Sequence, residues 1–229
     1  MIIGNGLVAK GFAVYQKKEN VIIFASGVSN SKEQRKKEFE REFNLLKNLK
    51  VDNETLVYFS TCSIFDETIK NTPYVLHKKE IENYISKKFK NYIIFRLPTL
   101  LGKTSNPNTL FNFFYNKIKS GQNIPIYKNA YRYLIDIDDI SKLLPQIIDD
   151  KKNWRKKINV VFKKPISTLN IIKVIMKELN LSANLELFDL GEKFVIDNKD
   201  FIQLIDPNKY RIESDYNSNV LKKYCRMLL

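Results

Sequence analysis

Short apolar segments alternate with amphipathic segments along most of the chain. The apolar segments are short enough to be buried strands, and they lie at residues 1–3, 20–26, 56–59, 92–95 and 158–162. Between them, apolar side chains recur at helical spacing in residues 32–49, 73–88, 106–119 and a segment that opens at Asp136. Strands that alternate with helices predict an α/β fold with a doubly wound, mostly parallel sheet.

The remaining elements are shorter. Residues 124–127 and 132–135 predict two short strands around a polar turn, and Ser167-Thr168 is typical of a helix start, with the helix running to about Leu179. The tail from Leu185 predicts further short elements, including residues 207–211 and 219–224. The charged helix at 32–49 is interpreted as presenting a solvated face.

The composition limits the class of protein. The chain has 229 residues, 44% of them hydrophobic, and its apolar runs stay well below the ~20 residues that a membrane span needs. The amino terminus lacks the features of a signal peptide, and two cysteines, Cys62 and Cys225, are too few for a disulfide framework. We therefore expect a cytoplasmic protein without membrane association.

A net charge of +14 raises the question of nucleic-acid binding. The lysines, however, are spread along the helices and form no recognisable motif with aromatic residues, so a phosphate-bearing small ligand is favoured over nucleic acid. No His, Cys or Asp cluster has the spacing of metal ligands, and no metal is expected.

A glycine fingerprint follows the first predicted strand. Gly4-Asn5-Gly6-Leu7-Val8-Ala9 matches G-x-G-x-x-A between a strand and a helix, which is the position that dinucleotide binding requires. The glycines permit a tight turn and close approach of the backbone to a pyrophosphate, and Ala9 lets the helix pack on the sheet. The pattern predicts a Rossmann-type sheet with a dinucleotide on this turn.

The strand at residues 56–59 ends in hydroxyl side chains and is followed by a tyrosine and a lysine. Ser60 and Thr61 lie at its carboxyl end, and Tyr74 and Lys78 lie one helical turn apart, roughly 6 Å at Cβ. An ammonium about 5 Å from a phenol favours the phenolate by roughly 3 kcal/mol at an effective dielectric of ~20. This would lower the tyrosine pKa by about two units, toward the range of a general acid or base.

Other tyrosines in the chain have the same spacing to a lysine or arginine. They are Tyr84/Lys88, Tyr92/Arg96 and Tyr115/Lys119, and they are interpreted as surface pairs because no hydroxyl-ending strand precedes them. His77 is expected on the surface, pointing away from Tyr74, and Cys62 is expected to be a small buried residue.

These motifs, in this order, resemble the extended short-chain dehydrogenase/reductase family, the epimerase/dehydratase group that acts on nucleotide sugars. Residues 4–9 look like its dinucleotide loop, and Phe24-Ala25-Ser26-Gly27 resembles the strand end beneath the cofactor. Ser60-Thr61-Cys62-Ser63-Ile64-Phe65-Asp66 is closest to the corresponding stretch of dTDP-4-dehydrorhamnose reductase-like members. By the resemblance, Thr61, Tyr74 and Lys78 take the catalytic positions.

The resemblance extends to later motifs. Arg96-Leu97-Pro98-Thr99 looks like the family's Arg-x-Pro-x beside the nicotinamide, and residues 132–139 resemble a motif whose arginine binds the substrate pyrophosphate. An ordinary ion pair of Arg132 with Asp136 or Asp138 is an equal alternative. The implied cofactor-binding residues are Gly4, Asn5, Gly6, Leu7, Val8, Ala25, Ser26, Gly27, Ser60, Tyr74, Lys78, Leu97 and Pro98, and the implied substrate-binding residues are Thr61, Cys62, Thr99 and Arg132.

The chain departs from the family after its first helix. Relatives have two further strands and a helix before the strand that corresponds to residues 20–26, with a residue that grips the adenosine ribose. Their absence leaves NAD or NADP unassigned. It also implies a rare left-handed crossover if the helix keeps its usual face, so either the helix changes face or the sheet order shifts. We expect a Rossmann-type domain over residues 1–163, with 99–133 contributing to a cap, and a small substrate-binding cap over 164–229.

The resemblance implies an NAD(P)-dependent oxidoreductase acting on a nucleotide-linked sugar, most closely a 4-ketoreductase. A 4-epimerase with the same site is an alternative, and so is a non-catalytic homologue that binds a nucleotide sugar or a partner. Cys62-Ser63 stand where a dehydratase has an Asp-Glu pair, which argues against dehydration. Assembly as a homodimer is left open.

Overall fold

The computed structural model describes residues 1–162, 164–205 and 213–228. A five-stranded parallel sheet has the order β1-β2-β3-β4-β9, and three two-stranded sheets join β10 to β7, β11 to β6 and β5 to β8. The main sheet consists of β1 (Ile2–Ile3), β2 (Val21–Phe24), β3 (Thr55–Thr61), β4 (Tyr92–Leu97) and β9 (Lys156–Asn159). The predicted doubly wound α/β fold is confirmed.

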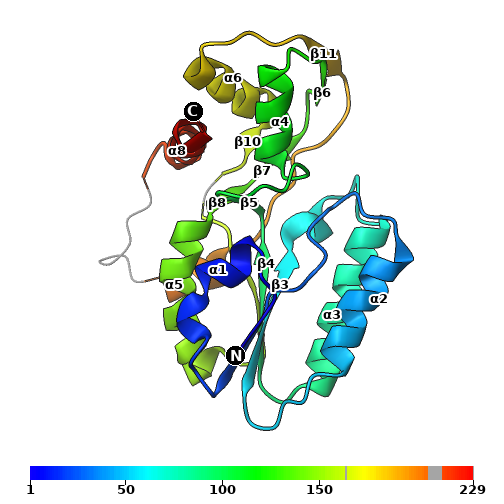
Figure 1. Cartoon of the computed structure of the whole chain (residues 1–229), viewed down its shortest axis with the longest axis vertical. Coiled ribbons are helices and arrows are strands. Elements are labelled where there is room, and N and C mark those ends of the chain that lie inside the picture. The colour runs from blue at the N-terminus through cyan, green and yellow to red at the C-terminus, as the bar shows by residue number, and fades with distance from the viewer. Residues whose placement is uncertain (163, 206–212, 229) are drawn as a thin grey trace.

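Helices cover both faces of the main sheet (Figure 1). One face carries the short α1 (Leu7–Gly11) and α5 (Ile137–Asp149), and the other carries α2 (Lys36–Lys47) and α3 (Pro73–Lys88). The strand side chains divide accordingly. Val57 and Phe59 belong to the apolar cluster under α1 and α5, whereas Leu56 and Tyr58 belong to the cluster under α2 and α3. The continuous apolar run of β3 is thus explained by burial on both faces.

The connection after β1 has the rare hand that the sequence raised as a difficulty. The strands β1, β2 and β3 are adjacent in this order, so the connections β1-α1-β2 and β2-α2-β3 cross the sheet in the same direction. Because α1 and α2 lie on opposite faces of the sheet, the two connections have opposite hands. Phe12 and Tyr15, which follow α1, are almost fully buried on the α5 face and fix this choice. The expectation that either the helix or the strand order would shift to avoid a left-handed crossover was wrong. The shortened sheet leaves β1 as an edge strand.

A second group of elements lies above the carboxyl ends of the main strands (Figure 1). It contains α4 (Leu110–Lys119), β6 (Ile124–Tyr127), β7 (Tyr131–Arg132), β10 (Ile166–Ser167), α6 (Thr168–Leu179), β11 (Leu185–Phe188) and α8 (Tyr216–Leu228). β5 (Thr99–Leu101) and β8 (Leu134–Asp136) form a parallel pair that joins this cap to the sheet. α7 (Lys199–Leu204) packs near β9 instead, although its residues fall within the predicted cap segment.

Most predicted boundaries lie close to the observed ones, with two corrections. The last core strand lies at Lys156–Asn159, not at 158–162, because its register is set by pairing with residues 93–96 of β4. The strand predicted at 132–135 is two strands, broken at Tyr133, because Arg132 pairs with β10 and Leu134 pairs with β5. The element predicted at 207–211 lies outside the described residues.

Ion pairs and a hydrogen bond attach the C-terminal helix α8 to the start of α5. Lys223 Nζ lies 2.6 Å from a carboxylate oxygen of Asp136 and 2.6 Å from one of Asp138, and the Tyr224 hydroxyl donates to Asp136 at 2.5 Å. Burial, with Asp136 alongside, raises the pKa of Tyr224. The amino end of α5 is thereby fixed to α8.

Candidate active site

The glycine turn packs directly on the end of β2. Gly4 has φ +119°, and a Cβ placed there would lie 2.4 Å from the Ala25 carbonyl oxygen. Gly4, Asn5 and Gly6 are exposed, whereas the side chains of Leu7 and Val8 pack against the core. The turn therefore leaves its backbone open to a ligand, beside the segment Ala25–Gly27 that the sequence also predicted.

The predicted hydroxyls at the end of β3 are engaged within the protein. Thr61 Oγ1 accepts a hydrogen bond from the Ser63 amide at 3.1 Å and donates to Ser63 Oγ at 3.0 Å. It thereby caps the 3₁₀ turn Cys62–Phe65. Cys62 is buried with its sulfur 3.2 Å from the Arg96 carbonyl oxygen, and burial raises the pKa of its thiol. The expectation of a small buried cysteine is confirmed.

Ser60 belongs to a buried charge network that the sequence did not reveal. Its hydroxyl donates to Glu82 Oε1 at 2.7 Å, and Arg96 approaches both Glu82 oxygens, at 2.9 and 2.6 Å. Burial by itself raises the pKa of Glu82, but the hydrogen bonds and charge of Arg96 outweigh it and hold that pKa low. The network ties β3 to α3 and β4, and it orients Ser60 toward the protein interior.

Tyr74 and Lys78 lie on α3, which begins with Pro73 and follows the end of β3. Both residues are buried, with exposed fractions of 7% for Tyr74 and 2% for Lys78. Lys78 Nζ lies 6.0 Å from the centre of the Tyr74 ring. The structure thus brings the predicted pair close together, one helical turn apart, as the spacing indicated.

Lys78 is also paired with a buried carboxylate. Its ammonium lies 3.0 Å from Glu42 Oε1 on α2 and 2.9 Å from the Tyr58 hydroxyl on β3. Glu42 is fully buried, and His77 Nε2 lies 3.0 Å from its second oxygen. The expectation of a surface His77 was wrong, because its ring faces Glu42 and Phe39 rather than solvent.

The predicted cofactor residue Leu97 and the predicted substrate residues Thr99 and Arg132 lie at and beyond the end of β4. Leu97 is buried in the core, and Thr99 opens β5 with its amide bonded to the Tyr133 carbonyl oxygen at 3.0 Å. Arg132 lies 3.8 Å from Asp66 and donates to the neighbouring Tyr131 carbonyl oxygen at 2.7 Å. Burial lowers the pKa of Arg132, while Asp66 opposes the shift.

The ion pair proposed for Arg132 with Asp136 or Asp138 was wrong. Both of these carboxylates bind Lys223 on α8 instead. Arg132 faces Asp66, the last residue of the stretch that carries Thr61. Its guanidinium is therefore paired with a carboxylate that follows β3, and the predicted role of Arg132 in binding a substrate phosphate stays a prediction.

The site residues that sequence reasoning missed are Glu42 and Glu82. Glu42 follows Phe39 by three positions and precedes Leu46 by four, so it falls on the apolar face of α2. A carboxylate on a buried helical face requires a partner, and this was the available signal. The expectation of a solvated charged face holds for the exposed residues of α2 but not for Glu42.

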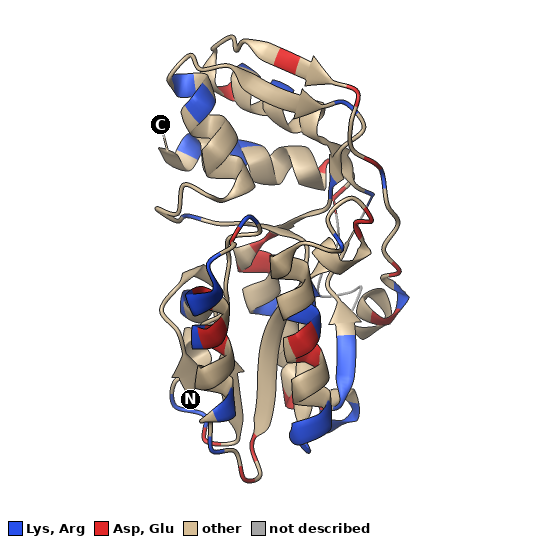
Figure 2. Ribbon diagram, turned by 90° about the vertical axis from the view of Figure 1, so that its right-hand side faces the viewer, with Lys and Arg blue, Asp and Glu red and all other residues tan. Residues whose placement is uncertain are grey.

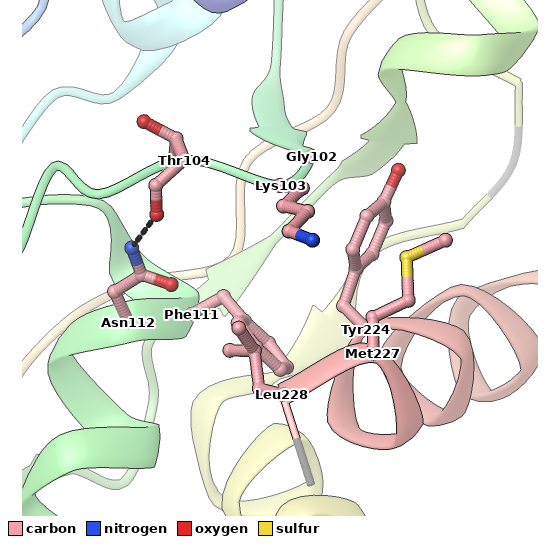
Figure 3. Close-up of a pocket in the computed structure, with 8 residues that line it drawn as sticks. All are labelled: Gly102, Lys103, Thr104, Phe111, Asn112, Tyr224, Met227 and Leu228. Atoms are coloured by element: carbon pink, nitrogen blue, oxygen red, sulfur yellow. Dashed lines mark hydrogen bonds between the residues drawn. The ribbon is translucent and has the colours of Figure 1, made fainter.

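A small pocket lies elsewhere, between the loop after β5, α4 and α8 (Figure 3). It is lined by Gly102, Lys103, Thr104, Phe111, Asn112, Tyr224, Met227 and Leu228. None of these residues was predicted for the site. Its interior has room for about one water molecule, so it is too small for a nucleotide sugar.

Charge and hydropathy add further constraints. Lys and Arg are interspersed with Asp and Glu over several helices and strand ends, and they do not follow a single element (Figure 2). Within the described ranges, no helix is long and apolar enough to cross a membrane. Over the same residues, no group of three or more His, Cys, Asp or Glu side chains is arranged to hold a metal ion.

Comparison with solved structures shows which proteins share this architecture. UDP-glucuronic acid 4-epimerase from Bacillus cereus, in complex with UDP-glucuronic acid and NAD, superimposes with a TM-score of 0.68 at 19% identity, over 96% of this chain and 79% of that one. The chain shares the fold of nucleotide-sugar epimerases. RMD from Pseudomonas aeruginosa, complexed with NADPH, gives a TM-score of 0.71 at 11% identity, over 99% and 89% of the two chains.

A third similar structure is dTDP-glucose 4,6-dehydratase from Bacillus anthracis in complex with NAD, with a TM-score of 0.71 at 13% identity, covering 99% of this chain and 78% of that one. No protein-family model matches the sequence, and a search of curated proteins finds no match either. The resemblance indicated by the motifs is therefore confirmed as a likeness of fold, and the shortened Rossmann-type sheet is consistent with a chain that covers 78–89% of these longer structures.

Proposed function

We propose that the protein is an NAD(P)-dependent oxidoreductase that acts on a nucleotide-linked sugar, with reduction of a 4-keto group as its reaction. The observation that carries the proposal is the position of Tyr74 and Lys78. They lie on α3, after the strand that ends in Thr61, in a fold whose similar structures hold NAD or NADPH. A phenol and an ammonium at this place are suited to moving a proton at a carbonyl.

The glycine turn supports the pyrophosphate part of a bound dinucleotide. Gly4 packs directly on the Ala25 and Ser26 backbone, Gly6 has open space where a Cβ would stand, and the exposed turn presents backbone groups to a ligand. The adenosine part has less support, because β1 is the edge of the sheet and no strand lies beyond it among the described residues. NAD and NADP are both retained as candidates for this reason.

Each side chain has a proposed role. The bound dinucleotide would supply the hydride. Thr61 would turn its hydroxyl from Ser63 to the carbonyl oxygen of the sugar, and Tyr74 would give that oxygen its proton. Lys78 would support the ionised phenol electrostatically, and Arg132 would hold a substrate phosphate in place of its weak contact with Asp66 at 3.8 Å.

Tyr74→Phe tests the proposal because it removes one oxygen and leaves the ring. We expect loss of turnover with nucleotide-linked 4-keto sugars, while NADPH affinity, measured by fluorescence titration, stays within about twofold. A variant with full turnover would reject the role of Tyr74. Stoichiometric consumption of NADPH would separate a reductase from the alternative 4-epimerase, which uses the same site without net consumption of cofactor.

A second candidate function is favoured by the pairing of Lys78 with Glu42. The Lys78 ammonium is already neutralised by Glu42, and the adenosine-side strands are missing from the main sheet. Both features would be expected in a non-catalytic homologue that binds a nucleotide sugar or a partner. This candidate predicts no binding of NADH or NADPH at millimolar concentration. Saturable binding of either dinucleotide would favour the enzyme.

A further inference from the structure

Glu42 connects four groups from three parts of the fold. Its carboxylate accepts from the Val28 amide at 2.7 Å, from the Tyr58 hydroxyl at 2.6 Å and from Lys78 at 3.0 Å, and His77 lies at 3.0 Å. The side chain has no exposed surface. Val28 follows the predicted cofactor segment, Tyr58 is on β3, and His77 and Lys78 are on the helix of Tyr74. The carboxylate thus lies between the cofactor side of the site and α3.

Gly27 shows how tightly this group fits. A Cβ at Gly27 would lie 2.7 Å from Lys78 Nζ and 3.1 Å from Glu42 Oε1. The ion pair therefore touches the backbone of the segment that is proposed to run beneath the dinucleotide.

We propose that Glu42 is a positioning residue of the active site, which fixes the place of the Lys78 ammonium and offsets its charge at Tyr74. The inference rests on the proposed function and deepens it. Lys78 would then orient the reacting groups mainly by hydrogen bonding, because its positive charge is compensated 3.0 Å away. Any phenolate formed at Tyr74 would gain less from the lysine than an unpaired ammonium would give.

Several other titratable groups lie around this pair and bear on its charge. They come from β3 and α3, and they are Tyr58, Tyr74, His77 and the more distant Glu82. Burial alone would raise the pKa of Glu42, but the Lys78 charge and the hydrogen bonds from His77, Tyr58 and Val28 hold it below its ordinary value. Glu42 is therefore ionised at neutral pH, where catalysis would be measured.

Glu42→Gln tests the proposal because the amide keeps the shape and an oxygen for Lys78 but removes the negative charge. We expect the pH profile of kcat to move to lower pH by about one to two units, the effect of an unpaired charge 6.0 Å from the Tyr74 ring at an effective dielectric of ~20. Glu38→Gln is the matched control, because Glu38 is on the same helix but pairs with Arg35 and Arg41. If the pH profile of kcat is unchanged in Glu42→Gln while its Tm is lower, Glu42 has only a structural role and the proposal is wrong.

A second measurement does not depend on turnover. Tyrosinate absorbance, titrated with pH in Glu42→Gln and in Glu42→Gln/Tyr74→Phe, isolates the ionisation of Tyr74 by difference. In the wild-type background the same difference is taken between the wild type and Tyr74→Phe. We expect Tyr74 to be half-ionised at a lower pH in the Glu42→Gln background than in the wild-type background. Equal midpoints in the two backgrounds would overturn the proposal. If the protein turns over no nucleotide sugar, the proposed function fails while this titration still decides the role of Glu42.

Glu42→Asp covers the case in which Glu42→Gln does not fold. It keeps the charge but withdraws the carboxylate from Lys78 by one methylene. We expect a shift in the same direction, smaller than that of Glu42→Gln. A folded Glu42→Asp variant with no shift in either measurement would contradict the inference.

Discussion

Replacing Lys78 with methionine would leave the Glu42 carboxylate buried without its counter-ion. The exposed fractions of the two side chains are 3% for Lys78 and 0% for Glu42, so solvent cannot take over the role of the ammonium. Removing one partner of such a buried pair costs about 3–5 kcal/mol. For a chain of this size, each kcal/mol lowers Tm by about 2–4 °C, which gives a fall of about 6–20 °C at neutral pH.

The sign of the pH dependence follows from Glu42. In the wild type its folded-state pKa is depressed, so its stabilising contribution is present above the ordinary value of 4.5 and is lost as the pH falls below it. In Lys78→Met, burial acts on Glu42 without the opposing ammonium and favours the protonated acid. The stability deficit of the variant should therefore be largest near pH 7 and shrink toward pH 4, as Glu42 takes up a proton.

Urea unfolding followed by circular dichroism measures the effect, with wild type and variant compared at pH 7 and at pH 4. The double variant Lys78→Met/Glu42→Gln is the control, because it removes the uncompensated charge and should recover most of the lost free energy of unfolding. A deficit below about 1 kcal/mol at pH 7, or the same deficit at both pH values, would refute this reasoning, since the first value is typical of an exposed ion pair.

Two further predictions concern the glycine turn and the C-terminal helix. Gly4→Ala should cost about 2 kcal/mol or more and weaken NADPH binding at least tenfold in a fluorescence titration, because Gly4 has φ +119° and its new Cβ would lie 2.4 Å from the Ala25 carbonyl oxygen. Gly6→Ala is the control for stability only, with open space around its Cβ, and an equal loss of stability in the two variants would contradict the prediction. Tyr224→Phe should lower the free energy of unfolding by about 1–3 kcal/mol through loss of its bond to Asp136, and an unchanged urea midpoint would show that α8 is held without it.

The sequence was sufficient for the order of the main elements. The apolar runs of the core strands and the start of α3 at Pro73 are local signals, and they predicted the parallel sheet and the position of Tyr74 relative to Lys78. The hand of the first connection was not predictable, because it depends on where Phe12 and Tyr15 are buried. Those contacts form with α5, which is distant in sequence.

The site was predicted only in outline, because its charge network is built from distant residues. Nothing close to Glu42 in the sequence indicates that its partners are on β3 and α3, since a mid-helix glutamate is usually solvated. The partner of Arg132 was missed for a similar reason, because Asp66 is far away in sequence and the nearer carboxylates bind α8. The roles of Thr61, Tyr74, Lys78 and Arg132 remain predictions, as does the division of the chain into a main domain and a cap.

The central claim is that a dinucleotide binds on the Gly4 turn with its reactive end toward Tyr74. Fluorescence titration of the wild-type protein with NADPH and with NADH, repeated with Gly4→Ala and Tyr74→Phe, tests it most directly. The account predicts saturable binding of at least one dinucleotide, nearly unchanged in Tyr74→Phe and strongly weakened in Gly4→Ala. No binding to the wild type at millimolar dinucleotide would contradict it.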